Sequence, residues 1–407
     1  MGAPLLRSLS RPLLVVLLIS LAGALWWYGV STNRLAARDL RYFQDHFPLS
    51  EPFAEAWLLM GNFTYYADLD PQGAAARYRQ AIVRKPLLID AWMNLAKVEL
   101  AGGREDEARR ILYAISPYIS HVSTWKWQEL LLARDLREDE LFAAALNFIL
   151  KRLPHRRTEA CFLAKGYWGD AQTTTTRVSE ENQAVLLLEL MKAREEDAAL
   201  MLWRSMEASS VLPDRTLRLD FCQFLLERGR LVEAKEVWNT WRSDGRGTVY
   251  DGGFEKELTN SGFGWRVERN PDVLVERTTG SALEGSYCLH LRFMGSRNIE
   301  FSHVYQIIPV EPCKQYHLKY AHKSKAITTD RGVYLQVNGY RCEGLELKSE
   351  PVLRDTQWTR EELMISVPCG CEAIALVVRR NESLMFDNKI SGDYWLDAVE
   401  LAEQHAP

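Results

Sequence analysis

The chain has 407 residues, of which 26% are charged, and a formal net charge of −4 at pH 7. This length allows two or three domains with hydrophobic cores of their own, and the composition is that of an ordinary globular protein. No basic stripe is present to hold a phosphate backbone, so we exclude nucleic acid as a partner.

The first predicted element is a membrane-targeting helix within residues 1–31. Its apolar segment, 12–30, is about as long as a bilayer is thick, follows Arg7 and Arg11, and ends in an aromatic belt. A short basic N-terminus seldom crosses a membrane, so we predict a signal anchor that leaves the bulk of the chain extracytoplasmic. The small residues 22–24 keep cleavage by a signal peptidase open as the alternative.

Residues 32–242 form the second predicted domain, and their pattern is helical and repetitive. Four times an alanine is followed one helical turn later by a large residue: Ala74 with Tyr78, Ala108 with Leu112, Ala199 with Trp203, and Ala234 with Trp238. The alanines are separated by 34, 91 and 35 residues. A period near 34 with this pairing resembles tetratricopeptide repeats. A helical bundle without a true repeat is the alternative.

The resemblance covers about residues 52–242 and implies an all-α superhelix of helical hairpins. In such repeats the alanine lets paired helices approach closely, and the large residue fills the groove between hairpins. An irregular insert is expected at 155–176. The concave surface of the superhelix implies a protein partner. The motif residues are predicted to be core: Trp57, Ala74, Tyr78, Trp92, Ala108, Trp203 and Trp238.

A short glycine-rich linker is predicted at 243–250, which limits the reach between the domains. In residues 251–407 short alternating runs are separated by turn residues. This pattern is typical of an antiparallel β-sandwich. The runs are 287–293, 304–310, 315–323, 332–337, 361–367 and 373–379.

The landmarks of this sandwich come in the order of a known family. A Gly-Phe-Glu start at 253–255 is followed by Gly285, Tyr316, Trp358 and a last strand around Asp397. In this order the region resembles non-catalytic carbohydrate-binding modules with a jelly-roll, galactose-binding-like fold. The resemblance implies a domain that holds a polysaccharide without reacting with it. The predicted fold class is therefore multidomain: a transmembrane helix, an all-α tetratricopeptide-like superhelix and an all-β jelly-roll sandwich.

Five of the seven cysteines lie in the sandwich: Cys288, Cys313, Cys342, Cys369 and Cys371. Because five is an odd number, at least one thiol stays free if the others pair within the domain. Free or loosely paired cysteines are our first interpretation. A disulfide between the turn at Cys313 and the turn that holds Cys369 and Cys371 is the alternative, which an oxidising compartment would allow.

No motif for catalysis is found in the sequence, so an enzyme is not expected. A Gly-x-Ser-x-Gly turn, a glycine-rich phosphate loop and a His-x-x-x-His pair are all absent. Glu361 and Glu362 are adjacent in a predicted strand, so they face opposite sides of the sheet and cannot flank one bond. No cofactor is required on this interpretation.

The resemblance does imply one structural calcium ion, where the first and last strands meet. Its side-chain ligands would be Glu255 of the Gly-Phe-Glu start and Asp397 of the last strand. Backbone carbonyls would complete the shell of hard oxygen donors that calcium prefers. The alternative is that both carboxylates only accept hydrogen bonds from nearby backbone amides.

Alternation along two strands gives the candidate glycan-binding residues. In both strands the apolar residues take one face and leave polar or aromatic side chains on the other. The residues left are His317, Lys319, Tyr334 and Gln336. An aromatic ring with polar neighbours suits the C–H face of a pyranose ring. Trp265 and Trp358 stand where the resemblance expects framework tryptophans of the core.

Taken together, these patterns predict a non-enzymatic, membrane-anchored scaffold, extracytoplasmic and thus periplasmic in a Gram-negative bacterium. Its repeats would bind a protein partner and its sandwich a polysaccharide, in the assembly or export of an envelope or extracellular polysaccharide. Two alternatives stay open. One is an assembly factor whose sandwich binds no sugar, and the other is a cryptic hydrolase, which the missing acid pair disfavours.

Overall fold

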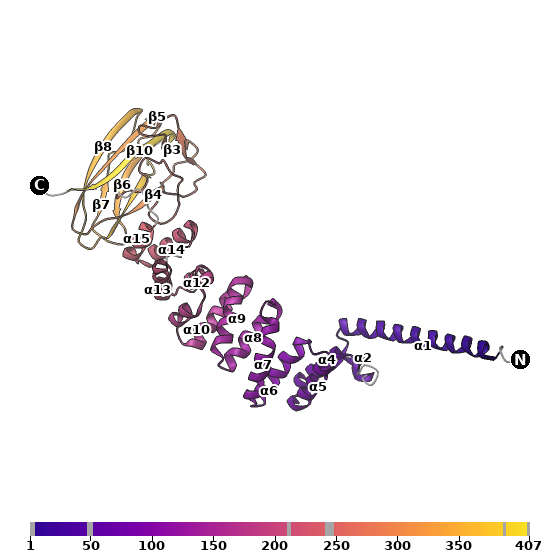
Figure 1. The fold of residues 1–407 in the computed structure, drawn as a ribbon. Coiled ribbons are helices and arrows are strands. Elements are labelled where there is room, and N and C mark those ends of the chain that lie inside the picture. The colour runs from indigo at the N-terminus through magenta and orange to yellow at the C-terminus, as the bar shows by residue number, and fades with distance from the viewer. Residues whose placement is uncertain (1–4, 47–51, 210–212, 241–247, 386–387, 405–407) are drawn as a thin grey trace. The chain divides into compact units, whose positions relative to one another are not determined.

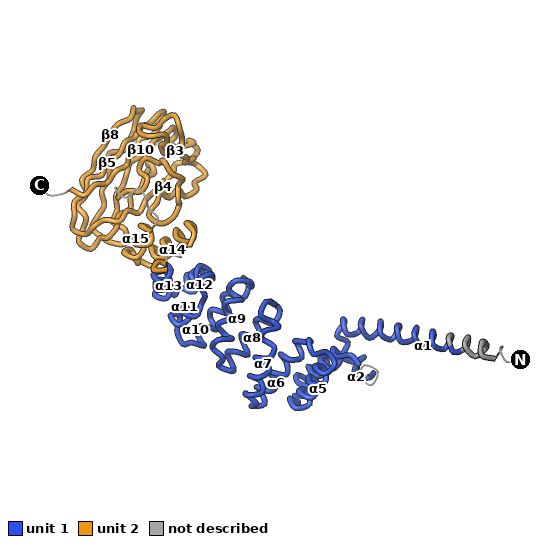
Figure 2. The backbone as a smooth tube through the Cα atoms, in the orientation of Figure 1, with its two compact units in different colours: residues 1–206 blue, residues 207–407 orange. Residues whose placement is uncertain are grey.

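The computed structural model describes residues 5–46, 52–209, 213–240, 248–385 and 388–404. Helices occupy the first part of the chain and strands the last, as the sequence predicts (Figure 1). The chain divides into two compact units, residues 1–206 and 207–407 (Figure 2). The second unit therefore holds the last helical hairpin together with the strands. Residues 243–247 of the predicted linker lie outside the described residues.

Helix α1 (Leu5–Ala36) is the candidate membrane span. Its segment Val15–Ala36 has a mean hydropathy of 1.6 and is almost entirely exposed, so the helix is long and apolar enough to cross a bilayer. Near its C-terminal end, Trp27 and Tyr28 contact Phe53, with ring centroids 5.1 and 5.8 Å apart. The aromatic end of the apolar helix is thus joined to the first helical hairpin.

Helix α2 (Leu40–Asp45) leads from α1 into three helical hairpins. The carboxylate of Asp39 accepts a hydrogen bond from the Tyr42 amide at the start of α2, and Phe43 is fully buried. The hairpins are α4 (Ala54–Tyr66) with α5 (Pro71–Arg84), α6 (Ile89–Ala101) with α7 (Glu105–Ile119), and α8 (Ser123–Asp135) with α9 (Asp139–Arg152). Each helix packs on its neighbour in the chain, as expected for short connections.

The predicted small-and-large pairs lie where the helices cross. Ala74, Ala108, Ala199 and Ala234 are fully buried, and each large partner is at most 2% exposed. At the first crossing, a Cβ added to Gly61 would lie 2.6 Å from the Tyr78 ring, so only glycine fits there. Trp57 and Trp92, predicted to be core, are only half-buried. The Arg84 guanidinium lies 4.7 Å from the Trp57 ring centroid, and the Trp92 indole N–H donates to the Pro86 carbonyl at 2.8 Å.

The predicted irregular insert at 155–176 is helical instead. It forms the one-turn helix η1 (Pro154–Arg156), α10 (Arg157–Trp168) and the two-turn α11 (Ala171–Arg177). Gly169, in the left-handed region at φ 89°, ends α10, and Asp170 caps α11. Helices α12 (Glu180–Ala193) and α13 (Glu196–Ala208) follow.

The last hairpin, α14 (Arg215–Arg228) and α15 (Leu231–Asn239), shares a core with the sandwich. Trp238 of α15 is 1% exposed and meets Tyr250 and Phe263 edge-on, with ring centroids 5.1 and 5.8 Å apart. A Cβ added to Gly262 would lie 2.5 Å from the Trp238 ring. The indole therefore packs directly on the backbone of the sandwich.

Two antiparallel five-stranded sheets form a jelly-roll-like sandwich. Sheet A has the strand order β1-β4-β9-β6-β7 and sheet B the order β2-β3-β10-β5-β8. The strands are β1 (Arg266–Val267), β2 (Val273–Thr279), β3 (Tyr287–Met294), β4 (Phe301–Pro309), β5 (Gln315–Lys325), β6 (Tyr334–Gly339), β7 (Glu346–Lys348), β8 (Thr356–Ser366), β9 (Ala373–Arg380) and β10 (Ser391–Glu403). The predicted fold class is confirmed, and every predicted run overlaps one of these strands.

The core of the sandwich lies between the sheets and is built from alternate residues of each strand. Trp265 belongs to it, as predicted: it is 1% exposed, and its ring centroid lies 5.0 Å from that of Phe254. Trp358 does not. It is half-buried on the outer face of sheet B, where its indole N–H donates to the Ser281 carbonyl at 3.1 Å.

Two disulfides close one end of the sandwich, Cys313–Cys369 and Cys342–Cys371. The alternative pairing of the Cys313 turn is therefore present, and the interpretation as free thiols is wrong for these four cysteines. Cys288 remains free and buried. Because Cys369 and Cys371 share one turn, the two bonds tie the β4–β5, β6–β7 and β8–β9 turns together.

Candidate functional site

The four predicted glycan-binding residues lie on two different faces. In β5, Tyr316 and Leu318 enter the core, so His317 and Lys319 lie on the outer face of sheet B. In β6, Leu335 and Val337 enter the core, so Tyr334 and Gln336 lie on the outer face of sheet A. The structure keeps each pair together but separates the two pairs by the thickness of the sandwich.

On sheet B, the predicted residues are paired with a neighbouring strand. His317 Nε2 lies 2.8 Å from Glu362 Oε2, and Lys319 Nζ lies 3.8 Å from Glu362 Oε1. Glu361 points the other way, toward the core, as predicted for adjacent residues of a strand. The polar groups of this pair therefore already have partners within the protein.

On sheet A, a row of outward side chains crosses all five strands. The register aligns Arg266 of β1, Tyr305 of β4, Val377 of β9, Gln336 of β6 and Lys348 of β7. We call the outward side of sheet A the sheet A face. Its outward residues on these strands include Arg266, Tyr305, Tyr334, Gln336, Asn338, Glu346, Lys348, Val377 and Arg379.

A hollow of about 160 Å³ lies at the Tyr334 end of this face. Tyr334 is 7% exposed, and its hydroxyl donates to Asn381 Oδ1 at 2.9 Å. The hollow is lined by Arg331, Gly332, Tyr334, Lys348, Ser349, Pro351 and Asn381. It combines one aromatic wall with amide and cationic groups, which is the composition that a sugar ring requires.

Three buried polar atoms of the sheet A face lack partners among the described residues. Gln336 is 3% exposed, and its Nε2 donates to Asn338 Oδ1 at 2.8 Å and to Glu346 Oε1 at 3.0 Å. Its Oε1 has no hydrogen-bond partner within the described residues, and neither has Nε of Arg379 or of Arg266. Buried polar atoms are nearly always paired, so three unpaired atoms on one face indicate that a polar ligand or water completes them.

The charges of the sheet A face are unbalanced. Its strands carry three cations, Arg266, Lys348 and Arg379, and one carboxylate, Glu346. Lys348 Nζ lies 2.7 Å from Glu346, which raises the pKa of the lysine and lowers that of the glutamate. Arg379 is 2.7 Å from Glu300, which stands before β4.

Arg266 differs from the other two cations in having neutral partners. It donates to Gln223 Oε1 at 2.6 Å and to the Gly262 carbonyl at 2.7 Å. Its guanidinium also lies over the Tyr305 ring, 5.6 Å from the centroid. Burial raises the pKa of Tyr305. The position of this arginine was not accessible from the sequence, because β1 has only two residues and no periodicity.

The predicted calcium ligands hold one loop by its backbone. Glu255 Oε1 accepts from the amides of Ser286 and Tyr287 at 2.8 and 3.0 Å, which lowers its pKa. Asp397 Oδ2 accepts from the amides of Leu283 and Glu284 at 2.8 and 3.1 Å. Burial raises the pKa of Asp397 despite these bonds.

The side chains of Glu255 and Asp397 both lie near Gly253, the first residue of the Gly-Phe-Glu start. A Cβ built there would lie 3.9 Å from Glu255 Cγ and 4.0 Å from Asp397 Oδ1. The donors are oxygens, which suits calcium in type. No third acidic, histidine or cysteine side chain joins them among the described residues. Their observed contacts are those of the alternative, acceptance of backbone hydrogen bonds, and calcium stays a prediction.

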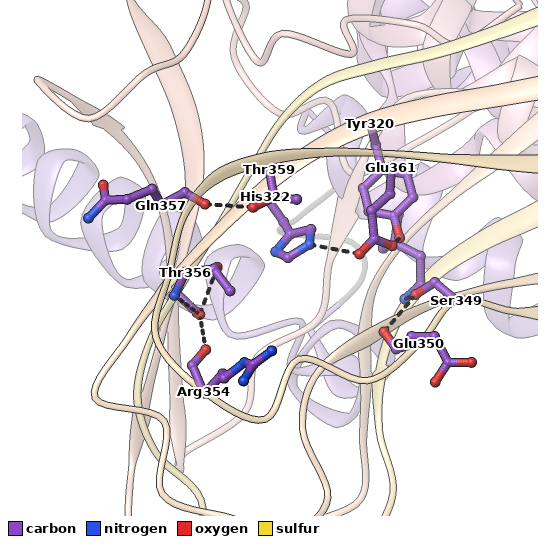
Figure 3. Close-up of polar contacts among 11 residues, drawn as sticks. Tyr320, His322, Ser349, Glu350, Arg354, Thr356, Gln357, Thr359 and Glu361 are labelled. Carbon is purple, nitrogen blue, oxygen red and sulfur yellow. Dashed lines mark hydrogen bonds and ion pairs between the residues drawn. The ribbon is translucent and has the colours of Figure 1, made fainter.

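A further polar cluster lies inside the sandwich (Figure 3). Tyr320 donates to Glu361 Oε2 at 2.5 Å, and His322 Nε2 lies 3.1 Å from Glu361 Oε1. Burial and this bond raise the pKa of Tyr320. Ser349 stands nearby, but its hydroxyl donates to the Glu350 carbonyl at 3.3 Å. Ser349 is thus not bonded to His322, and the cluster presents no serine–histidine pair.

Several solved structures share the sandwich fold at low identity. A family 16 carbohydrate-binding module is 15% identical with a TM-score of 0.29, and the match covers 38% of this chain and 99% of the module. The module TmCBM61, in complex with β-1,4-galactotriose, is 17% identical with a TM-score of 0.29, covering 39% and 100%. The cyclase Fisc from Fischerella sp. TAU is 12% identical with a TM-score of 0.27, covering 39% and 97%.

No protein-family model matches the sequence, and no curated protein matches it. The matches to carbohydrate-binding modules and to a cyclase cover only the C-terminal part of the chain. The sandwich fold itself rests on the strand order of the two sheets. Fold alone does not assign a ligand. The chemistry of this chain has to be argued from the residues of the sheet A face.

Proposed function

We propose that the protein is a membrane-anchored, non-enzymatic scaffold whose sandwich holds a polysaccharide on the sheet A face. The observation that carries this proposal is the hollow at Tyr334 on a face with three buried polar atoms that have no partners among the described residues, two of them on β6 and β9 next to Tyr334. A polysaccharide offers both an apolar ring face for the tyrosine and hydroxyl groups for the unpaired atoms. The row from Lys348 to Arg266 crosses all five strands, which suits a chain molecule better than a single small ligand.

The extracytoplasmic location is supported by the disulfides. Cys313–Cys369 and Cys342–Cys371 need an oxidising environment, which the cytoplasm rarely offers. The apolar helix α1 supplies a membrane anchor of sufficient length. Both features favour an orientation with the sandwich outside the cytoplasm, where envelope and extracellular polysaccharides are assembled or exported.

The helical hairpins are the proposed site for a protein partner. Their small-and-large crossings support a tetratricopeptide-like superhelix. Phe162 of α10 is 77% exposed and lines two hollows, of about 670 and 580 Å³. A large apolar side chain left in water between two hollows is typical of a surface that receives side chains of a partner.

A second candidate function is an assembly factor whose sandwich binds no sugar. The observation that favours it is the packing of the last hairpin on the sandwich. Gln223 of α14 accepts from both the Gly262 amide and Arg266, at 3.2 and 2.6 Å. One end of the sheet A face is thus already in contact with protein, and the sandwich could serve the helices alone.

Affinity electrophoresis of the full chain in detergent, through gels that contain polysaccharides, separates the two functions. Tyr334→Ala removes the aromatic wall of the hollow and should weaken retardation at least fivefold, since stacking on a ring contributes about 1–3 kcal/mol. His317→Ala, on the opposite face, is the matched control and should leave binding unchanged. A chain that no polysaccharide retards, although it melts cooperatively, supports the assembly factor.

A further inference from the structure

We propose that the polysaccharide held by the sheet A face is acidic, with carboxylate groups on its sugars as in uronic acids. This inference rests on the proposed function and specifies the ligand class for the same site. It follows from the kind of groups that surround the Tyr334 hollow and from the partners that those groups have.

The cations of the sheet A face lie on both sides of the candidate sugar position. Arg331 and Lys348 line the hollow, and Arg379 is the cross-strand neighbour of Tyr334. A pyranose ring stacked on the tyrosine would carry its C5 carboxylate outward from the ring, toward these groups. The lysine side chain is 50% exposed, so it can move to meet a ligand.

Arg379 has the donor geometry for a carboxylate. One terminal nitrogen holds Glu300 at 2.7 Å, while Nε is buried without a partner in the described structure. A guanidinium binds a carboxylate best through two parallel N–H groups, and an uncharged sugar hydroxyl satisfies only one. Because Glu300 is 61% exposed, water can solvate it when a ligand displaces it from the arginine.

Arg266, at the opposite edge of sheet A, is a second position that would favour a carboxylate group. Its observed partners are an amide oxygen, a carbonyl oxygen and an aromatic ring, so none of them neutralises its charge. A polymer with acid groups at intervals could reach both Arg379 and Arg266 across the sheet. A neutral polymer would leave this arginine uncompensated, which favours the acidic class.

The outer face of sheet B provides a comparison for the partners of these cations. There Arg292 pairs with Asp393 at 2.9 Å, and Arg360 pairs with Glu284. Lys319 shares Glu362 with His317. Lys323 of that face lies over the Trp395 ring and pairs with no carboxylate among the described residues. On the sheet A face, Lys348 and Arg379 have carboxylate partners as well. The difference between the two faces therefore lies in the unpaired Nε atoms of Arg266 and Arg379, not in the number of charges.

The test compares one polymer in two charge states, on the full chain in detergent. Polygalacturonate and its fully methyl-esterified form have the same sugar backbone, and the ester replaces each carboxylate charge by an uncharged methyl ester. We expect the acidic form to bind at least tenfold more tightly at 50 mM salt, and this preference to shrink at 500 mM salt, because screening weakens exposed charge pairs. Equal or tighter binding of the ester would overturn the inference and leave the proposed function intact. Absence of binding to both, and to neutral galactan, would overturn both.

Single substitutions test whether the preference for the acidic polymer arises at the sheet A face. Lys348→Gln and Arg379→Gln should each reduce the acid-over-ester ratio at least threefold, with little change in binding of the ester. Arg360→Gln removes a cation of sheet B and should leave the ratio unchanged. Lys348 is exposed, so its loss should not unfold the sandwich, and melting curves of all three variants monitor the fold. An unchanged ratio in both sheet A variants contradicts the proposal.

Discussion

The two outer faces of the sandwich are built by the same alternation but differ in how their polar groups are satisfied. On sheet B, Asp393 accepts from His290 and Arg292 at 2.7 and 2.9 Å, and Glu362 pairs with His317. On sheet A, Gln336 and Arg379 bury atoms that have no partner among the described residues. A face whose polar groups are paired within the fold has little to offer a ligand, whereas a face with unpaired groups needs a polar ligand or water to complete its hydrogen bonds.

The largest expected loss of stability comes from removing a disulfide that joins the two sheets. The Cys313–Cys369 bond joins the β4–β5 and β8–β9 turns, and both of these turns connect sheet A to sheet B. Replacing both cysteines by alanine should lower the free energy of unfolding by about 2–5 kcal/mol, because the unfolded chain regains the freedom of the closed loop. Chemical denaturation measures this loss. A stability within about 0.5 kcal/mol of wild type would show that the bond does not constrain the fold.

The second prediction concerns calcium binding by Glu255 and Asp397, which hold the loop that covers part of the sheet B face. If Glu255 and Asp397 bind the ion, millimolar calcium should stabilise the full chain by about 2.7 kcal/mol when its concentration is a hundred times the dissociation constant. Melting curves with calcium and with chelator give the difference, and the double alanine variant should abolish it. Superimposable wild-type curves would leave both carboxylates as hydrogen-bond acceptors only.

Asp393 makes the sheet B face sensitive to acid. Although burial raises its pKa, the hydrogen bonds from Arg292 and His290 have the larger combined effect and lower it. A depressed folded-state pKa adds stability above the unfolded value, near 3.9, and this stability is lost as pH falls through the folded value. Asp393→Asn should therefore cost about 1–3 kcal/mol at pH 7 and progressively less below about pH 4.

Chemical denaturation of wild type and Asp393→Asn at several pH values tests this dependence. Polysaccharide binding at neutral pH should not change in the variant, since Asp393 lies on the opposite face from Tyr334. A stability difference that is constant from pH 7 to pH 3 would falsify the assignment to this carboxylate.

The smallest expected effect on stability comes from a change at Gln336 of the sheet A face, which should affect binding far more than folding. Gln336→Leu removes a buried unpaired oxygen together with the two hydrogen bonds that Nε2 donates to Asn338 and Glu346. Because water can solvate both acceptors and most of the side-chain volume is kept, stability should fall by no more than about 1 kcal/mol. Polysaccharide binding should nevertheless fall at least tenfold, because the polar group that the ligand completes is gone. If stability falls by several kcal/mol while binding persists, Gln336 is a structural residue and the sheet A face loses its main support.

Sequence periodicity predicted the helices well where the size of one or two side chains determines how the helices pack. Ala108 and Leu112 could be placed in a helix crossing because only a small residue allows the close approach and only a large one fills the groove. The segment 155–176 was predicted to be irregular within the long gap between Ala108 and Ala199, where no further small-and-large pair was found. It folds as α10 and α11 since caps such as Asp170 start helices without such a pair.

The candidate site was predictable only in part. Alternation placed Tyr334 and Gln336 outward, yet it also grouped them with His317 and Lys319, because it gives the side of a strand and not the sheet to which the strand belongs. Arg379 could have been found outward in β9 by the same rule. Its place beside Tyr334 depends on the pairing of β9 with β6, which joins residues far apart in the chain.

The disulfide pairing and the position of Trp358 were hard to predict for the same reason: both depend on which segments, distant in the chain, come together in the fold. Spacing could propose a bond from Cys313 to the turn of Cys369 and Cys371, but the second bond to Cys342 requires that three turns meet at one end. Trp358 was assigned to the core from resemblance. Its half-buried position depends on the loop that brings the Ser281 carbonyl to the indole, and no local pattern predicts that contact.

The packing of Trp238 against Gly262 has a mechanical consequence. Because α15 and the sandwich share buried aromatic contacts, a pull on a captured polymer would be transmitted into α14 and α15 through packed side chains as well as through the covalent chain. A fragment that begins after residue 242 would leave Tyr250, Phe263 and the Gly262 backbone open to water. The smallest fragment that withstands tension should therefore begin before α14, at about residue 207, where the second compact unit starts.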